Sequence, residues 1–130
     1  MWTLIRNGGV IPMTVLLLFG LVSLGAAFYF AIRAEKRLLG FIKGMAAATL
    51  YTTLAATSAD VGATLYHTAE VMEAGEPYRF RGQPIQPSAM LVEGIAESTS
   101  PGILGFSFLA LTSMRTAVGR RRLDEREAVG

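Results

Sequence analysis

The chain has 130 residues, of which 52% are hydrophobic and 17% charged, whereas soluble domains carry about 25% charged residues. It contains no cysteine and one histidine, which excludes disulfides, thiolate catalysis, cysteine-based metal sites and sites built from several histidines. The net charge of +2 is too small to indicate a nucleic-acid partner. The apolar residues fall into three blocks, so we expect an all-α integral membrane protein with three transmembrane helices in a single domain, 1–130.

The first apolar block, 10–32, contains no charged residue. A run of about 20 apolar residues is enough to cross a bilayer. Pro12 falls in its first turn, where a missing N–H costs little. The alternative is a secretory signal peptide, whose apolar core is shorter, about 7–15 residues, and is followed by a cleavage site. Because this run continues through aromatic residues into Arg33, we favour a retained helix.

A basic connector, 33–43, leads to the second apolar block, 44–71, in which alanine, threonine and glycine dominate. Small residues let helix backbones approach closely, and hydroxyl groups can form hydrogen bonds between helices. We therefore expect a central span surrounded by protein. The alternative is an amphipathic helix lying on the membrane surface.

A polar loop with several prolines and glycines, 73–87, precedes the third predicted helix, 89–118. Glu93 and Glu97 lie in the first turns of this helix, and Pro101 can kink it. The last residues, 119–130, are rich in charge, and we expect a solvated or frayed tail.

The lysines and arginines predict the orientation. Three spans place nine of the twelve on one face of the membrane: Arg33, Lys36, Arg37, Lys43, Arg115, Arg120, Arg121, Arg122 and Arg126. The positive-inside rule then puts the N-terminus and the loop 73–87 outside and the C-terminus in the cytoplasm. We expect a multi-pass protein of the cell inner (plasma) membrane in contact with membrane lipid.

Four residues of the second span form what we call the polar stripe: Thr53, Thr57, Asp60 and Thr64. Residues three and four apart share one helix face, and His67 extends the line. A carboxylate within a span is costly, by about 3 kcal/mol on insertion scales, and such groups usually face protein, water or an ion. The polar stripe can therefore line an ion pathway. The alternatives are hydroxyls bonded to neighbouring backbone, a buried partner for Asp60 and an interfacial His67.

Glu93 and Glu97 are four residues apart and so share a face of the third helix. Two carboxylates on one face repel each other, which favours the retention of a proton by one of them, as proton relay requires. We place both in the candidate ion pathway, with Glu97 the deeper; the alternative for Glu93 is a solvated interfacial carboxylate. Gly105 continues this face and permits close helix packing.

The sequence offers no combination of nucleophile, base and acid, no phosphate-binding glycine loop and no metal-ligand cluster. We therefore expect neither an enzyme nor a cofactor, and a component of a membrane enzyme is the weakest interpretation.

Two short motifs resemble the MotA/TolQ/ExbB proton-channel family. Gly94-Ile95-Ala96-Glu97 followed by Pro101-Gly102-Ile103-Leu104-Gly105-Phe106 is similar to the pattern of that family's last helix, and Leu54-Ala55-Ala56-Thr57 to that of its second span. Glu97 matches the family's glutamate, Thr57 its threonine and Gly105 its packing glycine. The chain has a short connector in place of the family's large cytoplasmic domain.

The resemblance implies a ring of identical subunits in the inner membrane around a single-span TolR/ExbD-like partner that carries an essential aspartate. Proton flow through the ring would drive work in the cell envelope, with Glu97 as the matching glutamate. Asp60 stands where the family has a glycine, and we expect it to act as a relay group together with Glu97. The alternative is a structural or accessory subunit of a larger membrane complex that conducts no ions itself. In that case the small residues serve packing and Asp60 pairs across an interface.

Overall fold

The computed structural model describes residues 10–74, 78–80 and 83–129, which are almost entirely helical. The helices are α2 (Val10–Arg33), α3 (Leu38–Ala74), α4 (Pro87–Ser98) and α5 (Ser100–Val129). Between α3 and α4 lie two short antiparallel strands, β1 (Tyr78–Phe80) and β2 (Gln83–Ile85), in which Tyr78 is paired with Ile85.

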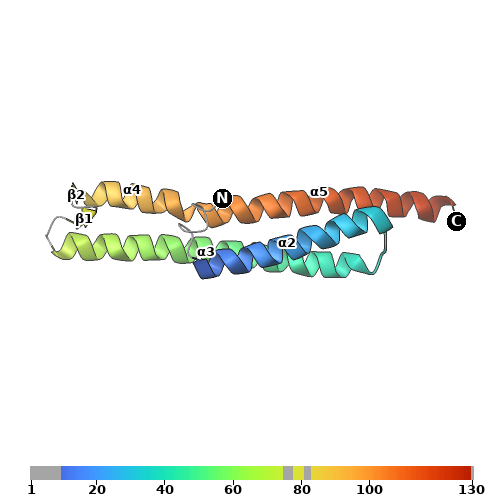
Figure 1. The fold of residues 1–130 in the computed structure, drawn as a ribbon, viewed down its shortest axis with the longest axis horizontal. Coiled ribbons are helices and arrows are strands. Elements are labelled where there is room, and N and C mark those ends of the chain that lie inside the picture. Colours follow the sequence, from blue (N-terminus) through green and yellow to red (C-terminus); the bar gives the residue numbers. More distant parts are fainter. Residues whose placement is uncertain (1–9, 75–77, 81–82, 130) are drawn as a thin grey trace.

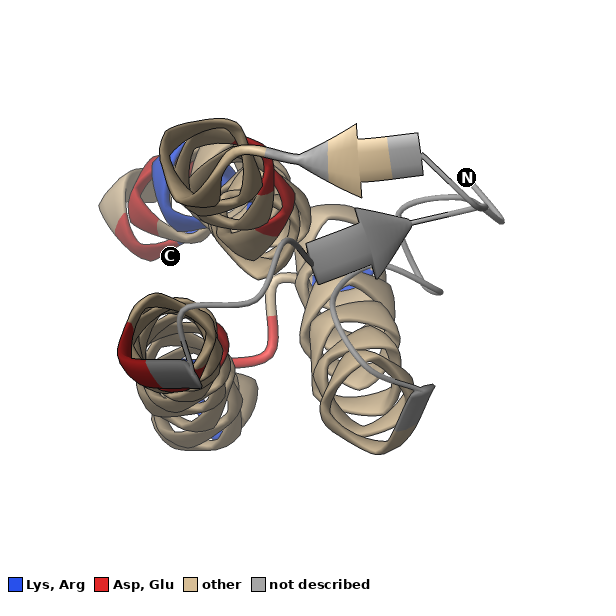
Figure 2. Ribbon diagram, turned by 90° about the vertical axis from the view of Figure 1, so that its left-hand side faces the viewer, with Lys and Arg blue, Asp and Glu red and all other residues tan. Residues whose placement is uncertain are grey.

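The helices form an elongated bundle with three columns (Figures 1 and 2). One column is α2, the second is α3, and the third is α4 continued by α5. α2 contacts both α3 and α5, whereas α4 packs against α3. Because the chain reverses direction at each connection, α2 and α5 run parallel to each other and antiparallel to α3.

The three columns differ in length, and this produces a two-helix arm. α3 has 37 residues, or about 55 Å at 1.5 Å per residue, whereas α2 has 24, or about 36 Å. α2 lies beside the first part of α3 and beside α5, so the second part of α3, together with α4 and the β-strands, extends beyond it (Figure 1). We call this extension the arm; it comprises residues 63–74 and 83–98, with the strand 78–80.

Glycines mark close approaches between the columns. A Cβ on Gly20 of α2 would overlap the ring of Phe108 of α5, and one on Gly119 would overlap the ring of Phe30. Phe30 is fully buried and forms a core cluster with Ala27 and Ile42. Small residues thus bring the backbones together, as they do between helices packed in membranes.

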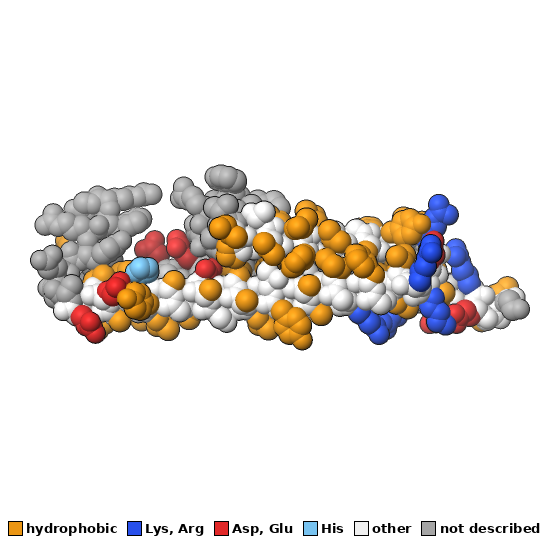
Figure 3. All heavy atoms as spheres, turned by 90° about the horizontal axis from the view of Figure 1, so that it is seen from below, with side chains coloured by type: hydrophobic (Ala, Val, Ile, Leu, Met, Phe, Trp, Pro, Cys, Tyr) orange, Lys and Arg blue, Asp and Glu red, His pale blue; other side chains and the backbone are white. Residues whose placement is uncertain are grey.

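Apolar side chains also cover much of the outside of the bundle. Exposed examples occur on each long helix, among them Leu18, Tyr51 and Phe106. In the space-filling view this apolar band lies along the middle, with basic side chains gathered at one end and acidic ones at both ends (Figure 3). By length and composition, three helices are suited to cross a membrane: Ile11–Arg33, Leu38–Glu73 and Pro87–Val129.

The structure corrects several predicted boundaries. α3 begins at Leu38, so the connector outside the helices is only 34–37 rather than 33–43. The third predicted helix, 89–118, is two helices that meet at Thr99, two residues before Pro101. The tail is not frayed through most of its length, because α5 continues to Val129. The predicted loop 73–87 contains the paired strands, and residues 75–77 and 81–82 lie outside the described part of the chain.

Candidate functional site: a polar seam between α3 and the third column

The polar stripe faces the third column through most of its length. Thr64 lies against Gly94, and Thr53 against Gly105, where an added Cβ would overlap the threonine side chain in both cases. Thr57 lies near Gly102, with its Oγ1 3.8 Å from the position of an added Cβ. The stripe and these glycines therefore form one interface, which we call the polar seam.

Two members of the polar seam carry buried polar atoms without a partner. The Oδ2 atom of Asp60 and the Oγ1 atom of Thr57 are inaccessible to solvent, and neither has a hydrogen-bond partner among the described residues. Leaving a buried polar group unsatisfied costs about 1–3 kcal/mol, more for a charged group. Such exceptions call for a specific explanation, for example an ion, a water molecule or a partner that belongs to the working complex.

Other hydroxyls of the seam are bonded to the backbone of their own helix. Thr53 donates to the carbonyl of Thr49 at 2.7 Å, and Thr64 donates to that of Asp60 at 3.0 Å. Thr49 and Thr68, one turn further along at each end, form the same type of bond. For Thr53 and Thr64, therefore, the structure shows hydroxyls bonded to backbone, which was the alternative interpretation. Within the stripe, Thr57 and Asp60 are the residues that keep a buried side-chain atom without a partner among the described residues.

Glu93 and Glu97 lie on the outside of α4 and are exposed. The contacts of Gly94 with Thr64 and of Gly102 with Thr57 place Glu97 and Asp60 at the same level of the bundle. The face of α4 that meets α3 instead carries Gly94 and the buried Ser98, whose hydroxyl donates to the Gly94 carbonyl at 2.7 Å. Within one chain, the two glutamates thus flank the seam rather than line it.

His67 lies outside the seam as an exposed residue of the arm. Its Nδ1 is 3.3 Å from a carboxylate oxygen of Glu70, and its ring packs edge-on against Tyr66. Both side chains of this contact are more than half exposed, so its contribution to stability is small.

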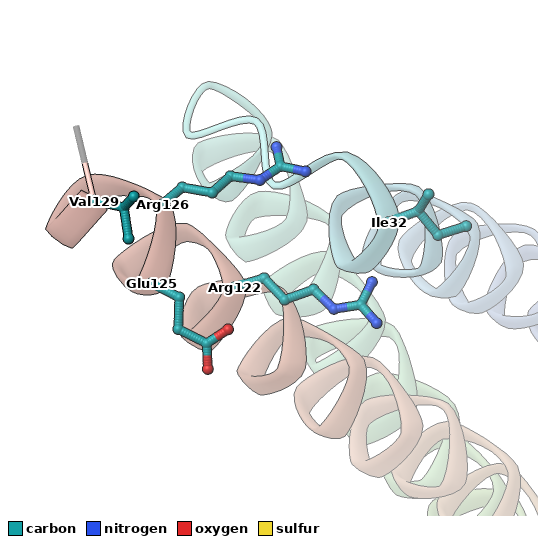
Figure 4. A pocket seen from close by; sticks show the side chains of 5 residues that line it. All are labelled: Ile32, Arg122, Glu125, Arg126 and Val129. Atoms are coloured by element: carbon teal, nitrogen blue, oxygen red, sulfur yellow. The ribbon is translucent and has the colours of Figure 1, made fainter.

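At the opposite end of the bundle, arginines of the charged tail cap the C-terminus of α2. Arg122 donates to the carbonyl of Ala31 and Arg126 to that of Arg33, each at 2.8 Å. Figure 4 shows the side chains of Arg122 and Arg126 extending from α5 toward the end of α2. The last carbonyls of a helix lack intrahelical donors, so cations placed here satisfy them and oppose the helix dipole. Sequence reasoning missed this role because it treated these arginines only as topology signals.

Arg115 is the basic residue set deepest along α5. Its guanidinium lies 4.2 Å from the centre of the Phe28 ring, and its Nε is buried without a hydrogen-bond partner among the described residues. An aromatic face partly compensates a cation that is withdrawn from water.

Within the described ranges, no three histidine, cysteine, aspartate or glutamate side chains gather as metal ligands would. The candidate site therefore consists of hydroxyl and carboxyl groups.

No family model, curated protein or solved structure matches the chain in comparisons with known proteins. The resemblance to the MotA/TolQ/ExbB family rests on the short motifs alone and stays a prediction.

Proposed function

We propose that the chain is a subunit of an oligomeric proton channel of TolQ/ExbB type, inserted three times in the inner membrane with its basic end in the cytoplasm. Protons enter at Asp60, exchange with the Thr57 hydroxyl and pass along the polar seam. The observation that carries this proposal is that Asp60 and Thr57, three residues apart on α3, each keep a buried oxygen without a partner among the described residues. A carboxylate kept in this position at a cost in stability is typical of a functional group within a membrane protein.

The exposed glutamates support an assembly of several copies. Glu93 and Glu97 share the surface of α4 with the exposed apolar residues Val92 and Ile95. Carboxylates mixed with large apolar side chains at the rim of a membrane domain are suited to contact a neighbouring subunit or a single-span acidic partner. In such a ring Glu97 would lie between subunits, at the level of Asp60, and could pass protons to the seam.

The tight packing of the seam favours a second candidate, a structural or accessory subunit. Thr53 is fully buried against Gly105, and its hydroxyl is already bonded to the backbone. In a single chain this contact closes the seam below Thr57. For the accessory subunit, the free oxygen of Asp60 would accept a hydrogen bond from another protein.

The two candidates are separated by measuring proton flux and assembly on the same preparations. The complex is purified in mild detergent with its co-purifying chains, its native mass is determined, and it is reconstituted into vesicles that contain a pH-sensitive dye. The variants are Asp60→Asn and Glu97→Gln, which keep side-chain shape, with Glu73→Gln, on the exposed end of α3, as the matched control.

For the channel, we expect Asp60→Asn to abolish proton flux while the native mass stays that of the wild type. Glu97→Gln should also reduce flux, and Glu73→Gln should leave it unchanged. Loss of assembly in Asp60→Asn, without flux in the wild type, would favour the accessory subunit. Undiminished flux in both Asp60→Asn and Glu97→Gln would refute the relay.

A further inference from the structure

A cavity of about 280 Å³ lies between α3 and α5 at the basic end of the bundle. Its apolar lining consists of Ile42 and Ala46 from α3 and Ala117 from α5. Hydroxyl groups and cations complete the wall. The cavity belongs neither to the unpartnered Asp60–Thr57 pair nor to the arginines that cap α2.

Two cations line this cavity without an acidic partner. Within the part of the chain that the structure describes, Lys43 and Arg120 form no ion pair and no side-chain hydrogen bond. Their neighbours differ, because Lys36 is paired with Glu127 at 3.1 Å and Arg121 with Glu125 at 3.0 Å. The positive charge that faces the cavity is therefore not neutralised by the protein.

A buried hydroxyl provides a second, independent observation. Thr112 lines the cavity, is 2% exposed, and its Oγ1 has no hydrogen-bond partner among the described residues. The neighbouring Thr116 does not satisfy it, since its hydroxyl donates to the Thr112 carbonyl at 2.7 Å. This hydroxyl is inaccessible to solvent, so an oxyanion held by the two cations would become its acceptor only after the threonine side chain turns toward the cavity.

We propose that this cavity binds the phosphate of an anionic phospholipid, with Lys43 and Arg120 as its counter-charges. Its lining residues Lys43 and Arg120 belong to the basic end, where Figure 3 shows the apolar band giving way to basic side chains. In the proposed membrane placement this is the depth of phospholipid head groups. The exposed Leu111, Met114 and Phe41 offer apolar surface nearby for the acyl chains. Basic pockets between spans on the cytoplasmic side are suited to such head groups. The proposal rests on the membrane placement given above.

The test is native mass spectrometry of the intact protein titrated with phosphatidylglycerol, with phosphatidylcholine as the neutral reference. Lys43→Gln/Arg120→Gln removes the two cavity cations. Lys36→Gln/Arg121→Gln removes one lysine and one arginine from the same end but outside the cavity, and so controls for net charge. Thr112→Val removes the hydroxyl and keeps the shape of the side chain.

We expect one retained phosphatidylglycerol per wild-type chain, and a loss of affinity of about tenfold or more in the cavity double variant. The control pair should change affinity by less than about threefold, because exposed charges act weakly at a distance. Thr112→Val should weaken binding to a smaller extent. Equal losses in the two double variants would overturn the site in favour of general attraction to the basic end.

Two further outcomes are distinguishable. If millimolar inorganic phosphate displaces the lipid completely, the cavity is a site for a soluble anion and the lipid proposal is wrong. If a carbonate wash releases the chain from membranes, the membrane placement fails, and the lipid site fails with it. A chain that resists the wash but shows no preference for phosphatidylglycerol overturns the lipid site alone.

Discussion

The two ends of the bundle differ in how many of their charged side chains are bonded to other parts of the protein. At the basic end, Arg122 and Arg126 donate to the last carbonyls of α2, and Lys36 pairs with Glu127. At the other end, Glu93 and Glu97 are exposed on α4, and Asp60 keeps a buried oxygen without a partner among the described residues. At the basic end the arginines thus complete the end of α2, although Lys43 and Arg120 stay unpaired beside the cavity within the described part of the chain. In the arm and the adjoining seam, no basic side chain pairs with Glu93, Glu97 or Asp60 among the described residues.

Several of the contacts that stabilise the bundle therefore lie near the basic end. Arginines that satisfy helix carbonyls hold α2 against α5, and the close contact between Gly119 and Phe30 lies in the same region. Around Asp60, no side chain or backbone group of the described residues satisfies the buried carboxylate oxygen in this way. We therefore expect substitutions at packing and capping positions to change stability, and substitutions at the unpartnered groups to change function.

The largest effect on stability is expected from Gly105→Ala. The added methyl group would overlap the Thr53 side chain, and overpacking of this kind costs about 1–3 kcal/mol. The measurement is the free energy of unfolding in detergent micelles. Gly62→Ala is the matched control, because no atom lies within 4 Å of its added Cβ, and it should be neutral or stabilise by up to about 1 kcal/mol.

The double variant Thr53→Ala/Gly105→Ala sharpens this prediction. Shortening the threonine makes room for the new methyl group, so the double variant should recover part of the stability lost in Gly105→Ala. No loss in the single variant would show that α3 and α5 do not approach closely at this point.

A smaller effect is expected from Arg122→Gln/Arg126→Gln. Loss of two charge-assisted hydrogen bonds to the end of α2 should lower the free energy of unfolding by about 1–2 kcal/mol, since both partly face solvent. Amide hydrogen exchange should become faster in the last turn of α2. Arg121→Gln breaks only an exposed pair with Glu125 and should cost less than about 0.5 kcal/mol. Equal effects of the two changes would contradict the capping role.

Thr57→Val should leave stability unchanged or raise it by up to about 1 kcal/mol, because it removes a buried hydroxyl that has no partner. Proton flux in the reconstituted complex should nevertheless fall. Destabilisation by more than about 1 kcal/mol would mean that the hydroxyl is bonded in the folded protein. This variant therefore separates the effect of the Thr57 hydroxyl on stability from its effect on proton flux.

A small gain in stability is expected from Ala34→Gly at the end of α2. Ala34 has a φ of 54° and donates its N–H to the Phe30 carbonyl, the left-handed cap geometry in which glycine is usual. Glycine should stabilise by about 0.5–1 kcal/mol, because the strain that it relieves exceeds its added entropy cost in the unfolded chain. A lower melting temperature in this variant would contradict the left-handed geometry.

The first helix could be predicted closely, and the other two less well. The block 10–32 is uninterrupted by charge, and α2 spans Val10–Arg33. Apolar composition indicates where a membrane can be crossed, but helices continue through charged residues when these find partners. α5 includes the tail for this reason, since Arg121, Arg122 and Arg126 are bonded there. α3 begins at Leu38, six residues before the predicted 44, and only Lys43 is charged within 38–43.

The polar stripe was readable from spacing, since Thr53, Thr57 and Thr64 all face the third column. The exposure of Glu97 could not be predicted in the same way. Which residues of α4 face α3 depends on how α4 and α5 are joined at Thr99, and the spacing of residues does not reveal this junction. The unpartnered oxygens also depend on which groups each neighbouring helix presents, and this is a property of tertiary packing alone.

The proposed channel requires one arrangement of the chain, three membrane spans with the arm outside and the tail in the cytoplasm. Because the chain contains no cysteine, single substitutions report it directly by labelling with a membrane-impermeant maleimide. We expect Glu73→Cys to react in intact cells, Glu127→Cys to react only after lysis, and Leu18→Cys to react in neither case. Labelling of Glu127→Cys in intact cells, or of Leu18→Cys in lysed cells without detergent, would contradict the account.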